Sequence, residues 1–338
     1  MKQKRIGKQT VAFSAPPSIV GSAAAVGKKE GEGPLSSSFD LICEDAYCGE
    51  QSFEKAESAL QKLALTRALD KAQLSPSQLD YLFAGDLLNQ CTASTFALRE
   101  LGVPFFGLFG ACSTMAEGLS LAAMAIDGGY ADHTCAVTSS HFCSAERQFR
   151  QPLEYGGQRS PTAQWTATAA GAAVLAAEGA GPFVTHVTTG RILDGGIRDV
   201  SNMGAAMAPA AYDTLRCHFD DLGRSPGDYD LILTGDLGRI GRGIVLDFFR
   251  QDGVDLAPVY DDCGVLLYDQ AGQDVHAGGS GCGCSASVLC SWVLDGMRAG
   301  RWKQVLFCAT GALMSPTSSG QGESIPGICH AVAISCGR

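Results

Sequence analysis

The stretch DYLFAGDL at residues 80–87 decides the fold of this chain, because it returns as DLILTGDL at residues 230–237. A Ser-Pro pair precedes each copy, at Ser75-Pro76 and at Ser225-Pro226. The distance between the copies is roughly half the chain, which is far too long for a solenoid repeat. The repeat therefore predicts two similar halves that pack as one body.

Each copy is followed by a segment of small residues that opens a predicted helix. These segments are GACST at residues 110–114 and GCGCSAS at residues 281–287, and an apolar strand is expected after each helix, at 134–138 and at 304–309. Strands that alternate with helices favour a parallel or mixed sheet covered on both faces. We expect an α/β fold of two pseudo-symmetric halves, residues 1–180 and 181–338, each with a mixed β-sheet covered by helices.

Hydrophobic pattern and composition predict the other elements. We expect first strands at 11–13 and 183–185, a polar glycine-rich loop at 21–38, a helix at 54–70, buried strands at 81–85 and 105–109, and a closing strand at 172–177 that runs almost directly into the second half.

Composition excludes several classes of function. The chain has 338 residues, 46% of them hydrophobic and 18% charged, with a net charge of -10, which argues against non-specific nucleic-acid binding. Its 14 cysteines sit mostly in apolar runs of a large chain and lack the spacing of zinc sites, so we expect reduced thiols and no metal site. The apolar stretch 167–177 is too short to cross a bilayer, so we expect a soluble protein that works at a membrane only as a peripheral partner.

Cys112 is the candidate for covalent chemistry. It stands where an apolar strand ends and a helix begins, and the positive helix end would favour a thiolate nucleophile. The alternative is a buried structural thiol at a tight turn.

A second candidate site is the segment 139–165. It concentrates Arg147, Arg150 and Arg159 with a histidine and several aromatic residues in an otherwise acidic chain. Arginine forks suit carboxylates, and aromatic side chains suit a flat ring. The alternative is that these arginines pair with surface acids such as Glu146 and Glu154.

The segments ACSTMAEGL at 111–119 and AAGAAVL at 169–175 resemble the thiolase-like superfamily of thiolases and ketoacyl synthases. Its condensing members activate their cysteine with histidine or asparagine from the second half. Here LTGDLG at 233–238 and GCGCSA at 281–286 stand in those places. An aspartate beside Cys112 would raise the thiol pKa, so condensation is disfavoured. His276 is a candidate displaced base or an ordinary loop residue.

Segment 139–165, with ATGALMSPT at 309–317 and GQGESIPGI at 320–328, resembles the stage V sporulation protein AD family of spore-forming Firmicutes. The resemblance implies a non-catalytic protein that binds dipicolinic acid (pyridine-2,6-dicarboxylate) and takes part in its uptake into the developing spore. It implies no cofactor, calcium only as the dipicolinate chelate, and membrane proteins of the same sporulation complex as partners. It also implies a cytoplasmic location peripheral to the forespore or spore inner membrane. The resemblance to the thiolase-like superfamily, whose members usually dimerise along a strand of the first half, implies a homodimer.

The resemblance also suggests a ligand site, which carries over to this sequence residue by residue. Cys112 and His141 would form a vestigial catalytic floor, and the remaining candidate contacts are Ser113, Thr114, Arg147, Gln148, Arg150, Arg159, Thr310 and Ser315. Two alternatives stay open: an active ketoacyl synthase or acyltransferase that uses Cys112 with His141 or His276, and an interaction scaffold with a vestigial pocket.

Overall fold

The computed structural model describes residues 4–150 and 159–337. The first part of the chain contains β1 (Arg5–Ile6), β2 (Thr10–Ala12), β3 (Ser18–Val26), α1 (Lys28–Gly31), β4 (Leu41–Ile42), α2 (Phe53–Ala72), β5 (Tyr81–Gly85), α3 (Thr92–Leu98), β6 (Phe105–Leu108), α4 (Thr114–Asp127), β7 (His133–Ser140), α5 (Phe142–Gln148), β8 (Trp165–Thr166) and β9 (Ala169–Ala176).

The second part contains β10 (Phe183–Thr188), α6 (Met203–Leu222), β11 (Leu231–Thr234), α7 (Gly238–Gln251), β12 (Tyr260–Asp262), α8 (Cys263–Leu266), β13 (Gly279–Ser280), α9 (Cys282–Val288), α10 (Leu294–Arg298), β14 (Gln304–Ala312), α11 (Pro316–Gly320) and β15 (Gly327–Ser335). A π-helical turn, Leu289–Val293, joins α9 to α10.

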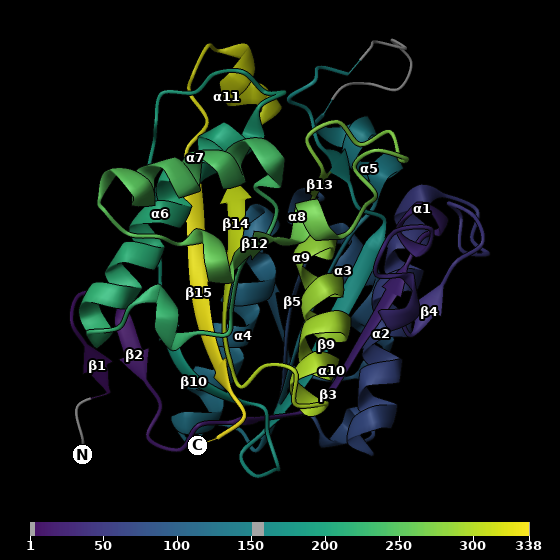
Figure 1. Cartoon of the computed structure of the whole chain (residues 1–338). Coiled ribbons are helices and arrows are strands. Elements are labelled where there is room, and N and C mark those ends of the chain that lie inside the picture. The colour runs from purple at the N-terminus through teal and green to yellow at the C-terminus, as the bar shows by residue number, and fades with distance from the viewer. Residues whose placement is uncertain (1–3, 151–158, 338) are drawn as a thin grey trace.

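The strand order shows the repeat in three dimensions. The central strands lie side by side in the order β12-β11-β14-β15-β10-β3-β9-β7-β5-β6. Counted outward from β3 in the first part and from β10 in the second, the strands of the two parts follow one another in the same order along the chain. In both parts the three outer strands are parallel and the two inner strands pair antiparallel. The fold is therefore α/β, as expected (Figure 1).

The repeated aspartates explain why the two copies look alike. Asp80 accepts hydrogen bonds from the backbone N–H groups of Asp132 and His133, which start β7. Asp230 accepts from Lys303 and Gln304, which start β14 in the same way. Each aspartate thus ties the start of one parallel strand to the start of its neighbour.

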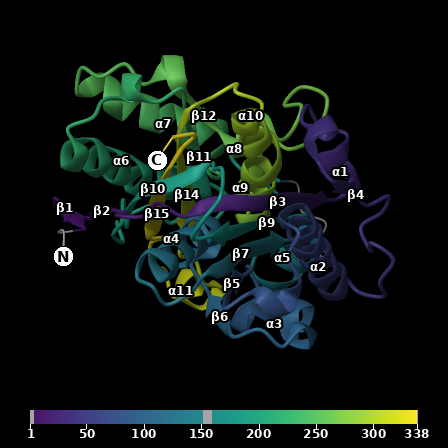
Figure 2. The ribbon, with the colours of Figure 1, turned by 90° about the horizontal axis from the view of Figure 1, so that it is seen from below.

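Helices cover the strands in layers. The helix α2 packs on β3, β9 and β7, whereas α6 packs on β15 and β14 with α7 beside it. Between them, α4 contacts β7 and β5 of the first part and β14 and β15 of the second. Figure 2 shows α6 and α7 on the far side of the molecule from α2 and α3. No helix among residues 4–150 and 159–337 is long and apolar enough to cross a membrane.

One of the two predictions for the start of the chain was wrong. Residues 21–38 were expected to form a loop, but β3 runs from Ser18 to Val26 and is almost fully buried. Its small side chains reflect close packing, because a Cβ added at Gly21 would lie 2.3 Å from the Ala68 carbonyl oxygen of α2. The predicted strand at 11–13 is confirmed as β2, which pairs with β1 and also with β10 of the second part.

The strand at 105–109 exists as β6 but is not buried as predicted. It is the edge strand of the sheet, and Phe105, Phe106 and Phe109 are 40%, 50% and 58% exposed. The predicted helix at 54–70 is confirmed as α2, and the closing strand as β9. The limits 1–180 and 181–338 stay a prediction.

Candidate functional site

Cys112 lies in a 3-10 turn, Ala111–Ser113, between β6 and α4. Ala111 has a φ of 52°, in the left-handed region, so the chain bends sharply just before the cysteine. The strand β14 passes close to this turn, since a Cβ added at Gly311 would lie 2.8 Å from the Gly110 carbonyl oxygen. The junction of strand, cysteine and helix predicted from sequence is therefore confirmed.

The side chain of Asp236 is the hydrogen-bond partner of the Cys112 thiol. The same carboxyl accepts from Thr310 Oγ1 at 2.8 Å, from Ser280 Oγ at 3.2 Å and from the Gly281 backbone N–H at 2.9 Å. Burial raises the pKa of Cys112 well above its ordinary value, and the nearby Asp236 carboxylate raises it further. The raised pKa of Cys112 favours the buried structural thiol over the activated nucleophile, the two alternatives weighed from the sequence.

The cavity above Cys112 is mainly apolar, and we call it the thiol chamber. It has a volume of about 260 Å³. It is lined by Leu87, Phe109, Ala111, Cys112, Phe149, Arg150, Met203, Met207, Ala312, Leu313 and Met314. These residues follow the carboxyl ends of β5, β6 and β14 or lie on α6 and after α5, so both parts of the chain build it.

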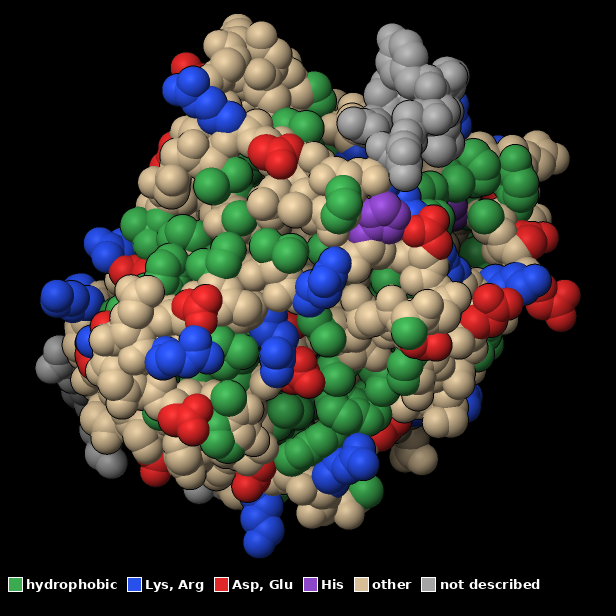
Figure 3. All heavy atoms as spheres, turned by 45° about the horizontal axis from the view of Figure 1, so that its top comes forward, with side chains coloured by type: hydrophobic (Ala, Val, Ile, Leu, Met, Phe, Trp, Pro, Cys, Tyr) green, Lys and Arg blue, Asp and Glu red, His purple; other side chains and the backbone are tan. Residues whose placement is uncertain are grey.

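A second cavity, which we call the arginine chamber, adjoins the first. It has a volume of about 170 Å³ and shares Phe149, Arg150, Met203 and Met314 with the thiol chamber. Its other lining residues are Glu146, Arg159, Ser160, Ala163, Gln164, Val200 and Ser201. Figure 3 shows the face at the upper end of Figure 1, where acidic and basic side chains are interspersed, so any anion site there is local.

Arg150 stands between the two chambers. Its Nη1 donates to the Gln164 carbonyl oxygen at 2.6 Å, and its Nη2 donates to Ser280 Oγ at 2.7 Å. Ser280 in turn donates to Asp236, so Arg150 reaches that carboxyl only through a hydroxyl. Its Nε is buried without a hydrogen-bond partner in the described part of the chain. Burial lowers the pKa of Arg150, which shows that the cation is poorly solvated.

Arg159 lines the arginine chamber from the other side. Its Nη2 lies 2.6 Å from Asp274 Oδ2, and its guanidinium lies over the ring of Trp165, 4.8 Å from the centroid. Its Nη1 is buried and has no hydrogen-bond partner among the described residues, and the same holds for Gln164 Oε1. The contacts among the described residues thus leave two donors and one acceptor at the chamber without a partner.

Two of the predicted site residues lie away from both chambers. His141 is buried and held by the Ala46 carbonyl oxygen on Nε2 and the Cys143 backbone N–H on Nδ1. Burial lowers the pKa of His141. Arg147 is half exposed and pairs with Glu54 of α2 at 3.4 Å. The surface pairing weighed for the arginines as an alternative therefore holds for Arg147, and also for Arg159, which pairs with the exposed Asp274.

Gln148 and Ser315 also line neither chamber. Gln148 accepts a hydrogen bond from the Asn89 backbone N–H. Ser315 caps α11, with its Oγ accepting from the Thr317 backbone N–H. Both side chains therefore have local structural partners. Glu154, weighed above as an acid partner of the arginines, lies outside the described residues.

Three predicted contacts lie near Cys112 but are already engaged. Ser113 donates to the Gly110 carbonyl oxygen and Thr114 to that of Ala111, as is usual in the first turn of a helix. Thr310 donates to Asp236. These three hydroxyl groups lie near Cys112 but line neither chamber.

His276 is held outside the cleft as well. Its Nδ1 contacts the Ser160 carbonyl oxygen at 2.8 Å and its Nε2 lies 3.0 Å from Asp274 Oδ1. Neither His276 nor His141 lines a chamber. Sequence reasoning missed Phe149, Gln164 and Met203 as lining residues, because nothing in their local pattern marks them.

Comparison with known proteins agrees with this architecture. The sequence model of the family described as Stage V sporulation protein AD (SpoVAD) matches residues 7–335. The stage V sporulation protein AD of Bacillus subtilis (strain 168) is 46% identical over 331 residues, which cover 98% of this chain and 98% of that protein.

Solved structures of condensing enzymes share the fold. The 3-oxoacyl-(acyl-carrier-protein) synthase III of Aquifex aeolicus VF5 superposes with a TM-score of 0.58 at 14% identity, over 94% of this chain and 99% of its own. A variant of OleA from Xanthomonas campestris gives a TM-score of 0.62 at 16% identity, over 96% of this chain and 99% of its own. The thiolase-like fold is therefore confirmed; at these identities the likeness extends to fold alone.

Proposed function

Because this chain belongs to the stage V sporulation protein AD family, we propose that its cleft binds dipicolinic acid and that the protein takes part, without catalysis, in loading this anion into the developing spore. The observation that carries the proposal is Arg150. It places a buried guanidinium between two cavities in a chain of net charge -10, with one donor that has no partner among the residues that the structure describes.

The ligand's shape matches what the cleft offers. Dipicolinate is a flat ring with a carboxylate on either side of the ring nitrogen. The apolar walls of the thiol chamber suit the ring, and the free donors of Arg150 and Arg159 suit carboxylate oxygens. Among the arginines predicted from the sequence, these two are retained for the proposed site and Arg147 is not.

Calcium does not need a cage of its own in this proposal. Dipicolinate supplies its ring nitrogen and both carboxylates to the ion, so the protein has only to bind the chelate. No resident cofactor is proposed.

The absence of catalysis rests on Cys112. A condensing enzyme needs a thiolate and a base, whereas here the thiol has a raised pKa and donates to a carboxyl. The two candidate bases, His141 and His276, are each held by other partners. The acyltransferase alternative is therefore the less well supported.

We also propose a homodimer formed through the edge of β6. An edge strand leaves backbone N–H and C=O groups unpaired, and here it carries the exposed rings of Phe105 and Phe106. A second copy would pair the edges and cover both rings in a symmetric contact. Membrane proteins of the sporulation complex, at the forespore or spore inner membrane, are the proposed further partners.

Calorimetric titration with dipicolinate, with and without calcium, tests the function. Picolinate, which has one carboxylate, is the matched control ligand. Saturable binding of dipicolinate that is much weaker for picolinate supports the proposal. No heat and no protection against thermal unfolding under either condition would refute it. Mass spectrometry after incubation with acyl thioesters tests the alternative, which requires an acylated Cys112.

A further inference from the structure

Behind Cys112 lie two fully buried carboxyl groups, Asp236 and Asp262, which we call the carboxyl pair. Neither lines a chamber. Asp236 bonds to Cys112, which does line the thiol chamber, and to Ser280, which bonds to Arg150. The pair is thus one side chain away from the proposed ligand site.

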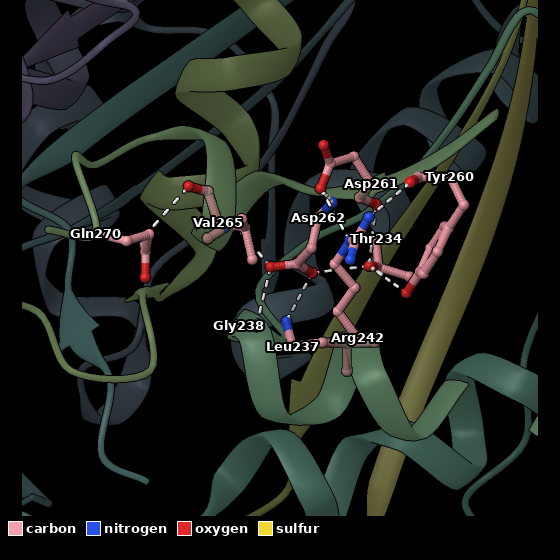
Figure 4. Close-up of polar contacts among 10 residues, drawn as sticks. Thr234, Leu237, Gly238, Arg242, Tyr260, Asp261, Asp262, Val265 and Gln270 are labelled. Carbon is pink, nitrogen blue, oxygen red and sulfur yellow. Dashed lines mark hydrogen bonds and ion pairs between the residues drawn. The ribbon is translucent and has the colours of Figure 1, made fainter. Parts of the chain in front are cut away.

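Asp262 holds the loop that carries Asp236. Its Oδ2 accepts from Thr234 Oγ1 at 2.7 Å and from the Leu237 backbone N–H at 2.9 Å, and its Oδ1 accepts from the Gly238 backbone N–H at 2.9 Å (Figure 4). These residues stand on both sides of Asp236 in the chain. The position of Asp236 therefore depends on Asp262, and the two groups form one electrostatic unit.

Both carboxyls hold protons more tightly than ordinary aspartates. Burial raises the pKa of Asp262 to about 7, with the charge of Asp236 as a further cause. Burial also raises the pKa of Asp236, against the effect of its hydrogen bonds. The ionisable groups that face the pair from the surrounding elements are Cys112, Arg150, Arg242, Tyr260, Asp261, Cys263, Cys282 and Cys284.

We propose that binding of dipicolinate in the cleft is coupled to the uptake of a proton by the carboxyl pair. This inference rests on the proposed function. In the free protein, the positive charge of Arg150 interacts with the Asp236 carboxyl of the pair. A bound dianion partly neutralises the charge of Arg150 and adds negative charge beside Cys112. Both effects disfavour the ionised form of the carboxyl groups behind Cys112.

Linkage fixes the sign of the effect. If the ligand makes the pair bind a proton more tightly, a proton must equally make the protein bind the ligand more tightly. The affinity therefore rises as the pH falls through neutrality, by up to about tenfold per pH unit for one proton taken up. The ligand's own carboxyls ionise in the acid range, near the ordinary value for carboxyl groups, so they do not produce this dependence.

The experiment counts protons on the full chain. Dipicolinate is titrated at about pH 7 in two buffers that differ in ionisation enthalpy, because the difference in observed heat gives the number of protons exchanged. Titrations at about pH 6 and about pH 8 then give the slope of affinity. Net uptake with affinity that rises toward acid pH supports the inference.

Variants assign the proton. Asp236→Asn replaces the carboxyl by a neutral group of the same shape, so its proton uptake should fall and its affinity at about pH 8 should exceed that of the wild type. Asp261→Asn, a partly exposed neighbour outside the pair, is the matched control and should keep the wild-type uptake. Glu146→Gln tests whether the proton goes to a carboxyl group outside the pair, because Glu146 lines the arginine chamber and lies near Arg150.

The outcomes separate the two claims. Binding with no proton exchange and no pH slope overturns the inference and leaves the proposed function standing, as does uptake that is undiminished in Asp236→Asn or that vanishes in Glu146→Gln. No binding at any pH overturns the proposed function and the inference with it. If Asp236→Asn does not fold, the proton count of the wild type and of Glu146→Gln decides.

Discussion

The Cys112 thiol donates a hydrogen bond to the Asp236 carboxyl, whose negative charge adds to the effect of burial in raising the thiol pKa. The pairing joins the start of α4 in the first part of the chain to the end of β11 in the second. It accounts for the absence of an activated thiolate better than any local feature of the cysteine turn, since a helix start alone would lower the thiol pKa.

Cys112 should therefore react slowly with alkylating agents. Only the thiolate attacks iodoacetamide, and the raised pKa of Cys112 leaves little thiolate at about pH 8. We expect the exposed Cys336 to be modified first and Cys112 to stay unmodified, as read by peptide mass spectrometry. Asp236→Asn should speed the reaction of Cys112, because the neutral amide removes a negative neighbour. Rapid alkylation of Cys112 in the wild type would contradict this account.

Replacing Arg150 should weaken dipicolinate binding far more than replacing Arg147. A charge-assisted hydrogen bond to a carboxylate contributes about 1.5–3 kcal/mol, so Arg150→Gln should raise the Kd by roughly 10- to 150-fold. Arg147→Gln is the control, since Arg147 pairs with Glu54 outside the cleft and should leave the Kd within about twofold. Calorimetry reports both values, and equal losses would remove Arg150 from the site.

Glu57 should make stability depend on pH near neutrality. It accepts from Ser139 and Ser144, and burial, with the charge of Asp86, raises its pKa to about 8. The unfolded chain loses this proton near the ordinary pKa of about 4.3. Between about pH 4 and about pH 8 the folded state therefore holds the extra proton, and the free energy of unfolding falls as the pH rises.

The matched variant for this effect is Glu57→Gln. It keeps the shape of the side chain without titrating, so its stability relative to the wild type should increase with pH, by about 1–3 kcal/mol from acid to neutral conditions. Urea unfolding at about pH 5, about pH 6.5 and about pH 8 measures the difference. A difference that does not change with pH would mean that Glu57 is ionised throughout.

Gly21→Ala should destabilise the protein because β3 packs directly on α2. The new methyl group would lie 2.3 Å from the Ala68 carbonyl oxygen and 2.9 Å from Ala72 Cβ, so the helix would have to move. We expect a loss of about 1–3 kcal/mol in urea unfolding. Gly243→Ala in α7 meets nothing within 4 Å and should stabilise by about 0.5–1 kcal/mol. Equal effects at both sites would argue against the close packing of β3.

Phe105→Glu should disrupt the proposed homodimer. The substitution places a charge on the edge of β6, where a second copy would pair. Analytical ultracentrifugation should show a dimer for the wild type and a monomer for this variant. Phe96→Glu is the control, because Phe96 is 55% exposed but lies on α3. A dimer that survives Phe105→Glu and dissociates in Phe96→Glu would place the interface elsewhere.

The repeated stretches and the helix at Phe53–Ala72 could be predicted from the sequence, because each depends on neighbours a few residues away. Asp80 and Asp230 stand at matching places in the two copies because each makes the same contact in its own part of the chain, where it joins the starts of two neighbouring strands. The turn at Cys112 could also be predicted, because an apolar strand is followed there by a segment of small residues. The strand Ser18–Val26 could not be predicted in this way, because its alanines, serines and glycine do not favour a strand by themselves. These small residues are required there because the helix α2 packs closely on the strand.

The site was decided by tertiary structure. Arg147 and Arg150 are three residues apart and look equivalent in the sequence, yet one faces α2 and pairs with Glu54 while the other stands between the two chambers. The state of Cys112 likewise depends on Asp236, more than a hundred residues away, and on burial that no local pattern reveals. Local sequence determines which segments form helices and strands. Charge, solvation and pKa are set by which distant groups the packing brings together.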